Sequence, residues 1–394
     1  MGFKYPINIP KPVLGVKSVI QNVVLPPEFT PILECFQRMT NDCIRIGLME
    51  GVTSLKSLSL KSYHKLDYKI YSQYKLCAIS AATGILKNHR RSKRRNPNTK
   101  IPHAKKLRLT TCYGFKIING SVRIPLQPRE YAYIPLNDHT LKVLSEPGLH
   151  VRSITLTPST ISICYSHECA EVECAGQTGI DRNLDNVTTA STDGGVAIYD
   201  LSKATEIKAT YREVKSHFRR NDDRIRKKIY RKYGIKQRNR VNTILHKTSK
   251  AIVEEAKVKQ IRPVMEKLTG IRKLYRKGNG QGNGYRSRLN SWSFYELQRQ
   301  IEYKAKWEGL SIVYVDPRGS SVKCSVCGSR TRKSGGRTIW CPECGAVMNR
   351  DINAARNLVA RGVRFAPVGG AGEAMVPVQR WPVDAPQPSQ VITL

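Results

Sequence analysis

Apolar and polar residues in the first part of this chain of 394 residues follow two different periods. Residues 13–25 alternate loosely and predict one strand, which ends at the pair Pro26-Pro27. From residue 29 to about residue 86, apolar positions recur at helical spacing. The clearest set is Ile32, Cys35, Phe36 and Met39. The pattern therefore predicts a strand followed by a small helical domain.

Short β-like runs separated by turns continue the chain up to about residue 175. They occupy residues 112–118, 121–125, 151–157 and 160–166. Together with the first strand, these runs could close a small barrel.

Residues 176–199 contain three more short strands joined by tight turns, and Asp181 lies on the first of them. A meander with an aspartate on its first strand is typical of the start of an RNase H-like sheet. Residues 203–240 then carry 15 Lys or Arg against four acids, yet keep apolar residues at helical spacing. These are Tyr211, Val214, Phe218, Ile225 and Ile229, and a second helix follows with Val241, Ile244, Leu245 and Ile252 on one face. We expect the aromatic residues here to belong to the core rather than to stack on bases.

The charge of the chain indicates a nucleic-acid partner. Its 67 Lys and Arg face 30 Asp and Glu, a formal net charge of +37 that a long polyanion would neutralise. A membrane-surface role is the rival, but the sequence shows no run of about 18 apolar residues, no signal peptide and no lipidation signal. We expect no membrane partner.

Two segments are the main candidates for phosphate contact. Residues 87–108 hold ten Lys or Arg, and residues 203–240 form the second basic segment. Such a run is often a solvated tail or a localisation signal, but here both runs lie between folded segments. The candidate nucleic-acid-binding residues are Arg90, Arg91, Arg94, Arg95, Lys105, Lys106, Arg219, Arg220 and Arg224.

Four of the 11 cysteines have the spacing of a zinc ribbon. Two Cys-x-x-Cys pairs, Cys324/Cys327 and Cys341/Cys344, stand 13 residues apart, and each is followed by a glycine. Four thiolates make a closed tetrahedral site, so one Zn²⁺ would support the fold and perform no chemistry. Redox pairs or free thiols are the alternatives. The other seven cysteines suggest a reducing compartment.

A second metal site is less favoured. His167, Cys169 and Cys174 lie close together in the sequence, but no fourth ligand follows at turn spacing.

The segment after the ribbon resembles the TnpB family, transposon-encoded RNA-guided nucleases related to type V CRISPR effectors. The resemblance rests on the two cysteine pairs followed by Arg350-Asp351-x-Asn353-Ala354-Ala355-x-Asn357. Upstream, Trp292, Leu297, Tyr303-Lys304-Ala305, Trp307, Gly309, Val315-Asp316-Pro317 and Ser320-Ser321 also resemble that family. The resemblance covers residues 176–358 well and the earlier residues only sketchily.

The resemblance implies three catalytic carboxylates. Gly179-Ile180-Asp181 resembles the first RuvC motif, with Asn183 where the family usually has glycine. Glu266 takes the place of the second acid, although Pro263 interrupts its apolar strand and Lys267 replaces a polar or acidic neighbour. Asp351, at the start of an alanine-rich helix over residues 351–359, takes the place of the third. Glu254 and Glu255 are the fallback candidates for the second acid.

The implied architecture is multidomain α+β. The expected domains are a β-barrel wedge domain (1–27 and 109–175) interrupted by a helical recognition domain (28–108), and an RNase H-like (RuvC) α/β nuclease domain (176–319 and 347–362). The zinc ribbon (320–346) is inserted in the nuclease domain, and a disordered tail (363–394) follows, with five Pro, three Gly and four charged residues.

The implied function is RNA-guided cleavage of double-stranded DNA next to a short flanking motif, with two Mg²⁺ ions held by Asp181, Glu266 and Asp351. The guide RNA would derive from a transposon end, and we expect a monomer in a prokaryotic cytoplasm that joins the nucleoid when bound to DNA. The first alternative is a guided repressor without cleavage, which is expected to lose the acids. The second is an unguided nuclease or transposase acting on transposon ends, which would not need the long N-terminal half.

Overall fold

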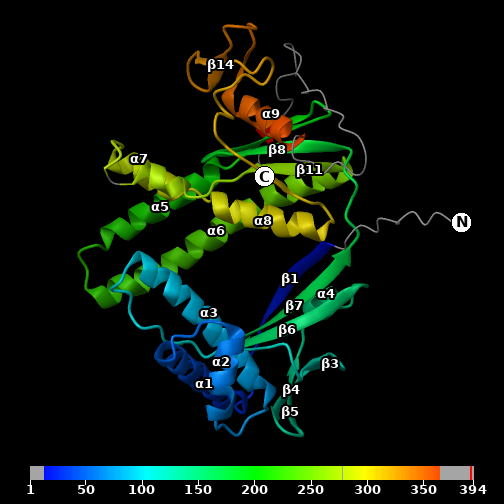
Figure 1. Cartoon of the computed structure of the whole chain (residues 1–394), viewed down its shortest axis with the longest axis vertical. Coiled ribbons are helices and arrows are strands. Elements are labelled where there is room, and N and C mark those ends of the chain that lie inside the picture. Colours follow the sequence, from blue (N-terminus) through cyan, green and yellow to red (C-terminus); the bar gives the residue numbers. More distant parts are fainter. Residues whose placement is uncertain (1–12, 277, 364–390, 393–394) are drawn as a thin grey trace, which may run out of the picture. The chain divides into compact units, whose positions relative to one another are not determined.

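The computed structural model describes residues 13–276, 278–363 and 391–392 (Figure 1). The chain divides into two compact units. One comprises Val16–Glu168, and the other comprises Cys169–Leu394 together with the residues up to Gly15. We call them the N-terminal unit and the C-terminal unit.

Three helices form the first part of the N-terminal unit, as the apolar period predicts. They are α1 (Phe29–Met49), α2 (Leu55–Ser62) and α3 (Gln73–Arg95), with a 3₁₀ turn η1 (Tyr63–Lys65). The side chain of Ser54 accepts a hydrogen bond from the Ser57 amide and caps α2. Phe36 and Met39 of α1 are buried, and so is Leu86 of α3. Helix α3 continues to Arg95, so the first part of the basic run is helical.

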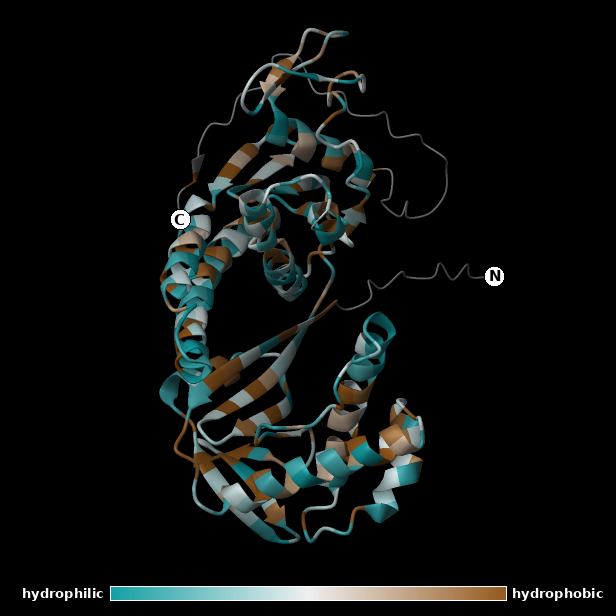
Figure 2. Cartoon of the chain, turned by 90° about the vertical axis from the view of Figure 1, so that its left-hand side faces the viewer, coloured by the Kyte–Doolittle hydropathy of each residue, from teal (hydrophilic) through white to brown (hydrophobic). Residues whose placement is uncertain are grey.

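The strands of the N-terminal unit form two sheets. One has the order β1-β7-β6-β2 and the other β3-β4-β5. The bounds are β1 (Val13–Asn22), β2 (Leu109–Thr111), β3 (Lys116–Ile118), β4 (Ser121–Gln127), β5 (Glu130–Pro135), β6 (Leu149–Thr157) and β7 (Thr160–Cys169), with helix α4 (Asp138–Leu144) between β5 and β6. Figure 2 shows hydrophobic and hydrophilic bands alternating along strands, the period expected of sheets with one buried face.

The expectation of one closed barrel therefore needs correction: in the described part of the unit, the strands pair in two separate sheets. The strand expected over residues 112–118 is broken. Gly114 has a φ of +76°, a conformation that turns the chain between β2 and β3. As a result, β2 pairs with β6 whereas β3 pairs with β4.

A six-stranded sheet forms the centre of the C-terminal unit, in the order β12-β11-β8-β9-β10-β16. The bounds are β8 (Gly176–Arg182), β9 (Asn186–Ser191), β10 (Val196–Asp200), β11 (Ile261–Glu266), β12 (Val313–Val315) and β16 (Val391–Ile392). Strands β8, β9 and β10 form the predicted antiparallel meander. Strand β11 lies parallel to both β8 and β12, so β8 and β11 end at the same edge of the sheet.

Helices cover both faces of this sheet (Figure 1). One face carries α5 (Ser202–His217), α6 (Asp223–Val258) and α8 (Phe294–Trp307), which share a core with Ile180 and Met265. Short elements precede α8, namely η2 (Ile271–Tyr275) and α7 (Asn283–Asn290). The other face carries α9 (Arg350–Val363), whose Leu358 packs on Val264.

Glycine allows α9 to approach the sheet closely. A Cβ built on Gly179 of β8 would lie 2.0 Å from the carbonyl oxygen of Ala355. Any larger residue at position 179 would therefore push the α9 main chain away from the strand.

The boundary between the two basic helices differs from the expectation. The break falls at residues 218–222, where the Asp222 side chain caps α6, and not near residue 240. Helix α6 then runs unbroken for 36 residues. Tyr211 packs partly on the core, as expected, but Ile225 lies in the stretch of α6 before its first buried residue, Val241, and is exposed.

The ribbon and the tail also depart from the expected boundaries. The ribbon sheet comprises β13 (Arg332–Lys333), β14 (Thr338–Trp340) and β15 (Val347–Asn349), so it extends three residues past position 346 and continues directly into α9. The tail expected over 363–394 falls mostly outside the described residues. Val363 ends α9, and β16 pairs with β10, where the last strand of the meander offers an open edge.

None of the helices in the described ranges is long and apolar enough to cross a membrane.

Candidate functional site

The four ribbon cysteines converge on one point. Their Sγ atoms all lie within 4.8 Å of one another. The Sγ–Sγ distance is 3.7 Å for Cys324 and Cys344, and 3.4 Å for Cys327 and Cys341. A tetrahedral site with Zn–S bonds of about 2.3 Å requires sulfur atoms about 3.8 Å apart. The thiols therefore fit one zinc ion with little adjustment.

The ribbon is tied to the start of α9 by two asparagines. The Asn353 side chain accepts a hydrogen bond from the Ser325 amide, next to Cys324, and donates to the carbonyl of Lys323. Asn357, one turn later, donates to the carbonyls of Lys323 and Ser320. The first cysteine turn is thus fixed to the helix that carries Asp351.

Asp181 lies near the end of β8 and is buried. Its Oδ2 accepts a hydrogen bond of 2.7 Å from Asn183, the residue that stands in place of the family's glycine. Burial raises the pKa of Asp181 to about 8, and the negative charge of Glu266 adds to this rise, against the opposing effect of the Asn183 hydrogen bond. Burial therefore favours the protonated form of this carboxyl group when no cation is bound.

Glu266 is the last residue of β11 and lies beside Asp181. Register pairs Met265 with Ile180, so Glu266 follows in register with Asp181 across the parallel strands. Both side chains then point away from the Ile180 face, toward the side that carries α9. Burial raises the pKa of Glu266, while the charge of Arg182 and a hydrogen bond from Ser320 lower it.

Pro263 fits in this strand because of where β12 begins. The pairing of β11 with β12 starts only at Val264, so at Pro263 the strand has β8 as its hydrogen-bonding neighbour among the described strands. The fallback acids lie elsewhere. Glu255 accepts a hydrogen bond from Tyr199 and pairs with Lys259, and Glu254 pairs with Lys250 on α6.

Asp351 lies in the first turn of α9, and arginines engage both of its oxygens. The guanidinium of Arg337, in the turn between β13 and β14, donates to Oδ2. The Nε of Arg350 lies 3.7 Å from Oδ1. The Arg337 main chain is also fixed, because its carbonyl accepts a hydrogen bond of 2.8 Å from the Arg350 amide.

The three acids are neighbours, but they are less tightly gathered than the cysteines. The charges of Glu266 and Asp351 both act on Asp181. Over the described residues, however, only the four cysteines form a group of three or more His, Cys, Asp or Glu with ligand atoms within 4.8 Å of one another. Each acid is held by its own partner: Asn183, Ser320 and Arg337. Buried carboxylates gathered from two strands and a helix are a suitable donor set for Mg²⁺, which prefers oxygen ligands.

Arg182 was not anticipated from the sequence. It is 1% exposed and lies directly after Asp181 on the opposite side of β8. Its guanidinium donates to the Glu266 carbonyl at 2.5 Å and to Gln298 Oε1 at 2.8 Å. This buried cation therefore joins the ends of β8 and β11 to helix α8. No local pattern in the sequence marks a buried arginine, because its partners are 84 and 116 residues away.

The candidate nucleic-acid-binding residues all lie on exposed surfaces. Four belong to the last turns of α3 and two to the segment before β2: Arg90, Arg91, Arg94, Arg95, Lys105 and Lys106. Arg219, Arg220 and Arg224 lie at the connection between α5 and α6.

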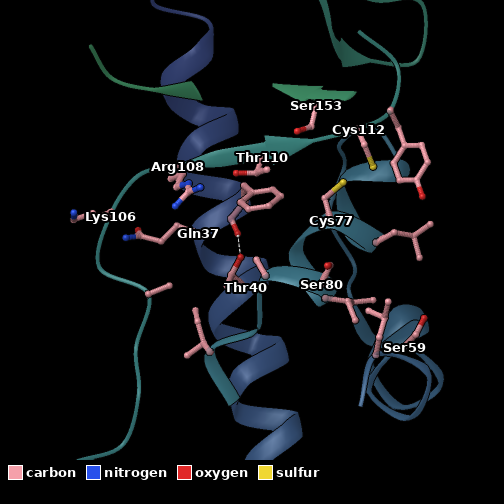
Figure 3. Close-up of a pocket in the computed structure, with 18 of the residues that line it drawn as sticks. Gln37, Thr40, Ser59, Cys77, Ser80, Lys106, Arg108, Thr110, Cys112 and Ser153 are labelled. Atoms are coloured by element: carbon pink, nitrogen blue, oxygen red, sulfur yellow. Dashed lines mark hydrogen bonds between the residues drawn. The ribbon is translucent and has the colours of Figure 1, made fainter. Parts of the chain in front are cut away.

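A cavity of about 1020 Å³ opens in the N-terminal unit beside Lys105 and Lys106 (Figure 3). Its walls are mostly apolar side chains of α1, α2 and α3, and Arg108 adds a further cation. Figure 3 shows Cys77 and Cys112 with their sulfur atoms turned toward one another at one side of this cavity. Both cysteines are free thiols.

The chain is similar to several known proteins. Residues 294–358 match the family profile described as "Cas12f1-like, TNB domain". The chain is 30% identical over 257 residues to a TnpB-like protein of Methanocaldococcus jannaschii, which covers 62% of this chain and 91% of the relative. It is 34% identical over 120 residues to the CRISPR-associated endodeoxyribonuclease Cas12f1 of Sulfoacidibacillus thermotolerans, covering 30% of this chain and 26% of that protein.

A solved structure shares the fold. The Cas12f1 chain of a Cas12f1–sgRNA–target DNA complex superposes with a TM-score of 0.58 at 15% identity, over 84% of this chain and 83% of the other.

Proposed function

Because this chain belongs to the TnpB family, which is related to miniature type V effectors, we propose that it is an RNA-guided, Mg²⁺-dependent DNA endonuclease. One observation carries the proposal. Asp181 and Glu266 lie side by side near the ends of adjacent parallel strands, and the charge of Asp351, from the first turn of α9, acts on Asp181. The strand order β12-β11-β8-β9-β10 supports an RNase H-like, RuvC-type assignment of this domain.

Asp181, Glu266 and Asp351 would hold the two cations. Bound there, Mg²⁺ would supply an activated water and stabilise the leaving oxygen of the phosphodiester. The protein's own contribution is to fix the carboxylates: β8 and β11 set the spacing of the first two, and the close contact of α9 with β8 sets the third. The low-dielectric surroundings of the buried carboxylates would strengthen their attraction for a bound cation. No nucleophilic side chain is needed.

The other parts would bind nucleic acid and stabilise the site. The charge of +37 supports long phosphate contact with a guide RNA and a target duplex, in which base pairing reads the sequence. The N-terminal unit would supply the recognition helices, over residues 28–108. It would also supply the wedge strands, which precede and follow these helices in the sequence. The ribbon would hold one structural Zn²⁺. The hydrogen bonds of Asn353 with Ser325 and Lys323 would then stabilise the start of α9.

The test separates a nuclease from a binding protein. Protein purified with its RNA should cut matched double-stranded DNA in Mg²⁺, and Asp181→Ala, Glu266→Ala and Asp351→Ala should each abolish cutting while still protecting the target from a footprinting nuclease. Glu255→Ala is the matched control and should cut normally. If all three variants cut, the assignment of the site is wrong, and equal cutting by RNA-free protein would favour the unguided alternative.

A non-cleaving repressor is the remaining candidate. Failure of the wild-type complex to cut a bound, matched target in Mg²⁺ would support it.

A further inference from the structure

The small sheet β3-β4-β5 of the N-terminal unit has one buried face, whereas its other face exposes side chains of β5 and is covered at Pro125 of β4. Val122 and Ile124 of β4, with Ala132 and Ile134 of β5, are buried and form the inner face. The side chains between them point the opposite way, because successive residues of a strand alternate. The outer face that they form contains neither the carboxylates nor the ribbon.

Two tyrosines and two cations share the outer face. Tyr131 and Tyr133 of β5 are 43% and 54% exposed. Register places Arg123 opposite Tyr133 and Lys116 opposite Arg123, so all lie on the same side of the sheet. The guanidinium carbon of Arg123 lies over the Tyr131 ring, 4.4 Å from its centre.

Such a surface matches the chemistry of unpaired nucleotides. Aromatic rings stack on bases irrespective of sequence, and neighbouring cations contact the phosphates. Residues two apart on a strand are about 7 Å apart, so each ring accepts its own base and the two bases do not stack on each other. Bases inside a duplex are covered by their neighbours and cannot use these rings.

We propose that this face, formed by Lys116, Arg123, Tyr131 and Tyr133, binds two unpaired nucleotides of the RNA that the protein carries. The inference rests on the proposed RNA-guided function. RNA is favoured over DNA because a resident guide stays bound between targets, whereas the target arrives as a duplex. The tyrosines hold the bases, and Arg123 and Lys116 neutralise the adjoining phosphates.

The first experiment uses the complex as it is purified. Ultraviolet crosslinking followed by trypsin should leave a nucleotide adduct on the peptide Glu130–Lys142, which trypsin releases by cutting after Arg129 and Lys142. A protein that purifies without RNA and binds none would contradict the proposed function itself. A protein that holds RNA but shows adducts only on other peptides would overturn the present inference alone.

The second experiment measures binding by fluorescence anisotropy, with RNA-free protein and two probes: a 12-nucleotide oligouridine and an RNA duplex of 12 base pairs. Tyr131→Ala/Tyr133→Ala should weaken oligouridine binding at least tenfold, because each stacked base contributes a factor of about 5 to 150. Duplex binding should stay within twofold. Tyr131→Phe/Tyr133→Phe keeps both rings and should bind oligouridine like the wild type.

Two further variants complete the test. Tyr295→Ala removes another exposed tyrosine and should change neither affinity. Arg123→Gln should reduce the salt dependence of oligouridine binding, whereas the tyrosine variants should leave it unchanged. An equal loss for the duplex, or no loss for oligouridine, would overturn the proposal. The proposal would also be overturned if Tyr131→Ala/Tyr133→Ala, in the complex that already carries its RNA, lost binding to oligothymidine, because the face would then bind DNA.

Discussion

Arg337 of the ribbon donates a hydrogen bond to Oδ2 of Asp351, so a cation from the ribbon occupies a ligand atom of the candidate metal site. The two residues are only 14 positions apart, and the carbonyl of Arg337 also accepts from the amide of Arg350. A metal ion at Asp351 would therefore share this carboxylate with a guanidinium, whose positive charge opposes the binding of the ion.

Removing this guanidinium should strengthen metal binding. A charge-assisted hydrogen bond at a half-exposed site contributes about 1 kcal/mol, which corresponds to roughly a fivefold change in affinity. We expect Arg337→Ala to bind Mn²⁺ about three to ten times more tightly than the wild type in RNA-free, zinc-loaded protein, measured by electron paramagnetic resonance. Arg332→Ala, in the same ribbon, removes the same charge without touching Asp351 and should bind Mn²⁺ like the wild type. Unchanged affinity in Arg337→Ala would contradict this prediction.

Because the folded state favours a protonated Asp181, the metal-free protein should lose stability as the pH rises and this proton is removed. Its pKa is raised from about 4 in an unfolded chain to about 8, so the folded state holds a proton that the unfolded state has released. Stability should be lost as pH rises through this window. Asp181→Asn has no such proton. The melting temperature of this variant minus that of the wild type should therefore increase between pH 5 and pH 9. A constant difference across this range would show that the carboxyl group is already ionised in the fold.

The same proton should oppose metal binding. Mn²⁺ binding must release it, so the apparent affinity of the wild type should rise between pH 6 and pH 8. Proton release in buffers of different ionisation enthalpy, measured by calorimetry, would check this. Binding without proton release would exclude a protonated site.

Loss of zinc should affect the candidate active site through α9. Structural zinc sites supply on the order of 10 kcal/mol of binding energy that is also folding energy. Cys324→Ser should bind well under one zinc per chain, melt at a lower temperature and lose cleavage, because Ser325 next to it holds Asn353 of α9. Cys164→Ser, outside the ribbon, is the control and should keep its zinc. Full activity in zinc-free protein would contradict a structural role for the metal.

Arg182 should contribute far more to the free energy of unfolding than an exposed arginine does. Replacing it by methionine leaves the Glu266 carbonyl and Gln298 without their buried donor, and we expect a loss of about 3 kcal/mol in the free energy of unfolding. Arg299, in an exposed pair with Glu296, should cost less than about 1 kcal/mol when replaced in the same way. Chemical denaturation of both variants measures the difference, and similar small losses would show that the buried guanidinium is dispensable.

The sequence predicted the parts of the structure that depend on local spacing. The cysteine pairs, the helices over 29–86 and the meander that begins at Gly176 each follow from a short pattern, and the structure contains all three. The assignment of Glu266 as the second candidate acid rests on the family resemblance, because Pro263 obscures its strand in the sequence. Arg182 and Arg337 could not be predicted, since their roles depend on partners brought close only by the fold. The split of the expected barrel likewise depends on how strands pair at long range.

The contact between Gly179 and Ala355 has a consequence for how this protein could be altered. Main chain rests on main chain at this point, so position 179 cannot take a side chain without moving β8 or the helix that carries Asp351. Farther along the same helix a side chain does lie between the two elements, because Gln177 of β8 lies against Gly362 of α9. An engineer who alters this domain should therefore keep both glycines, since a Cβ at either position would meet atoms that are already there.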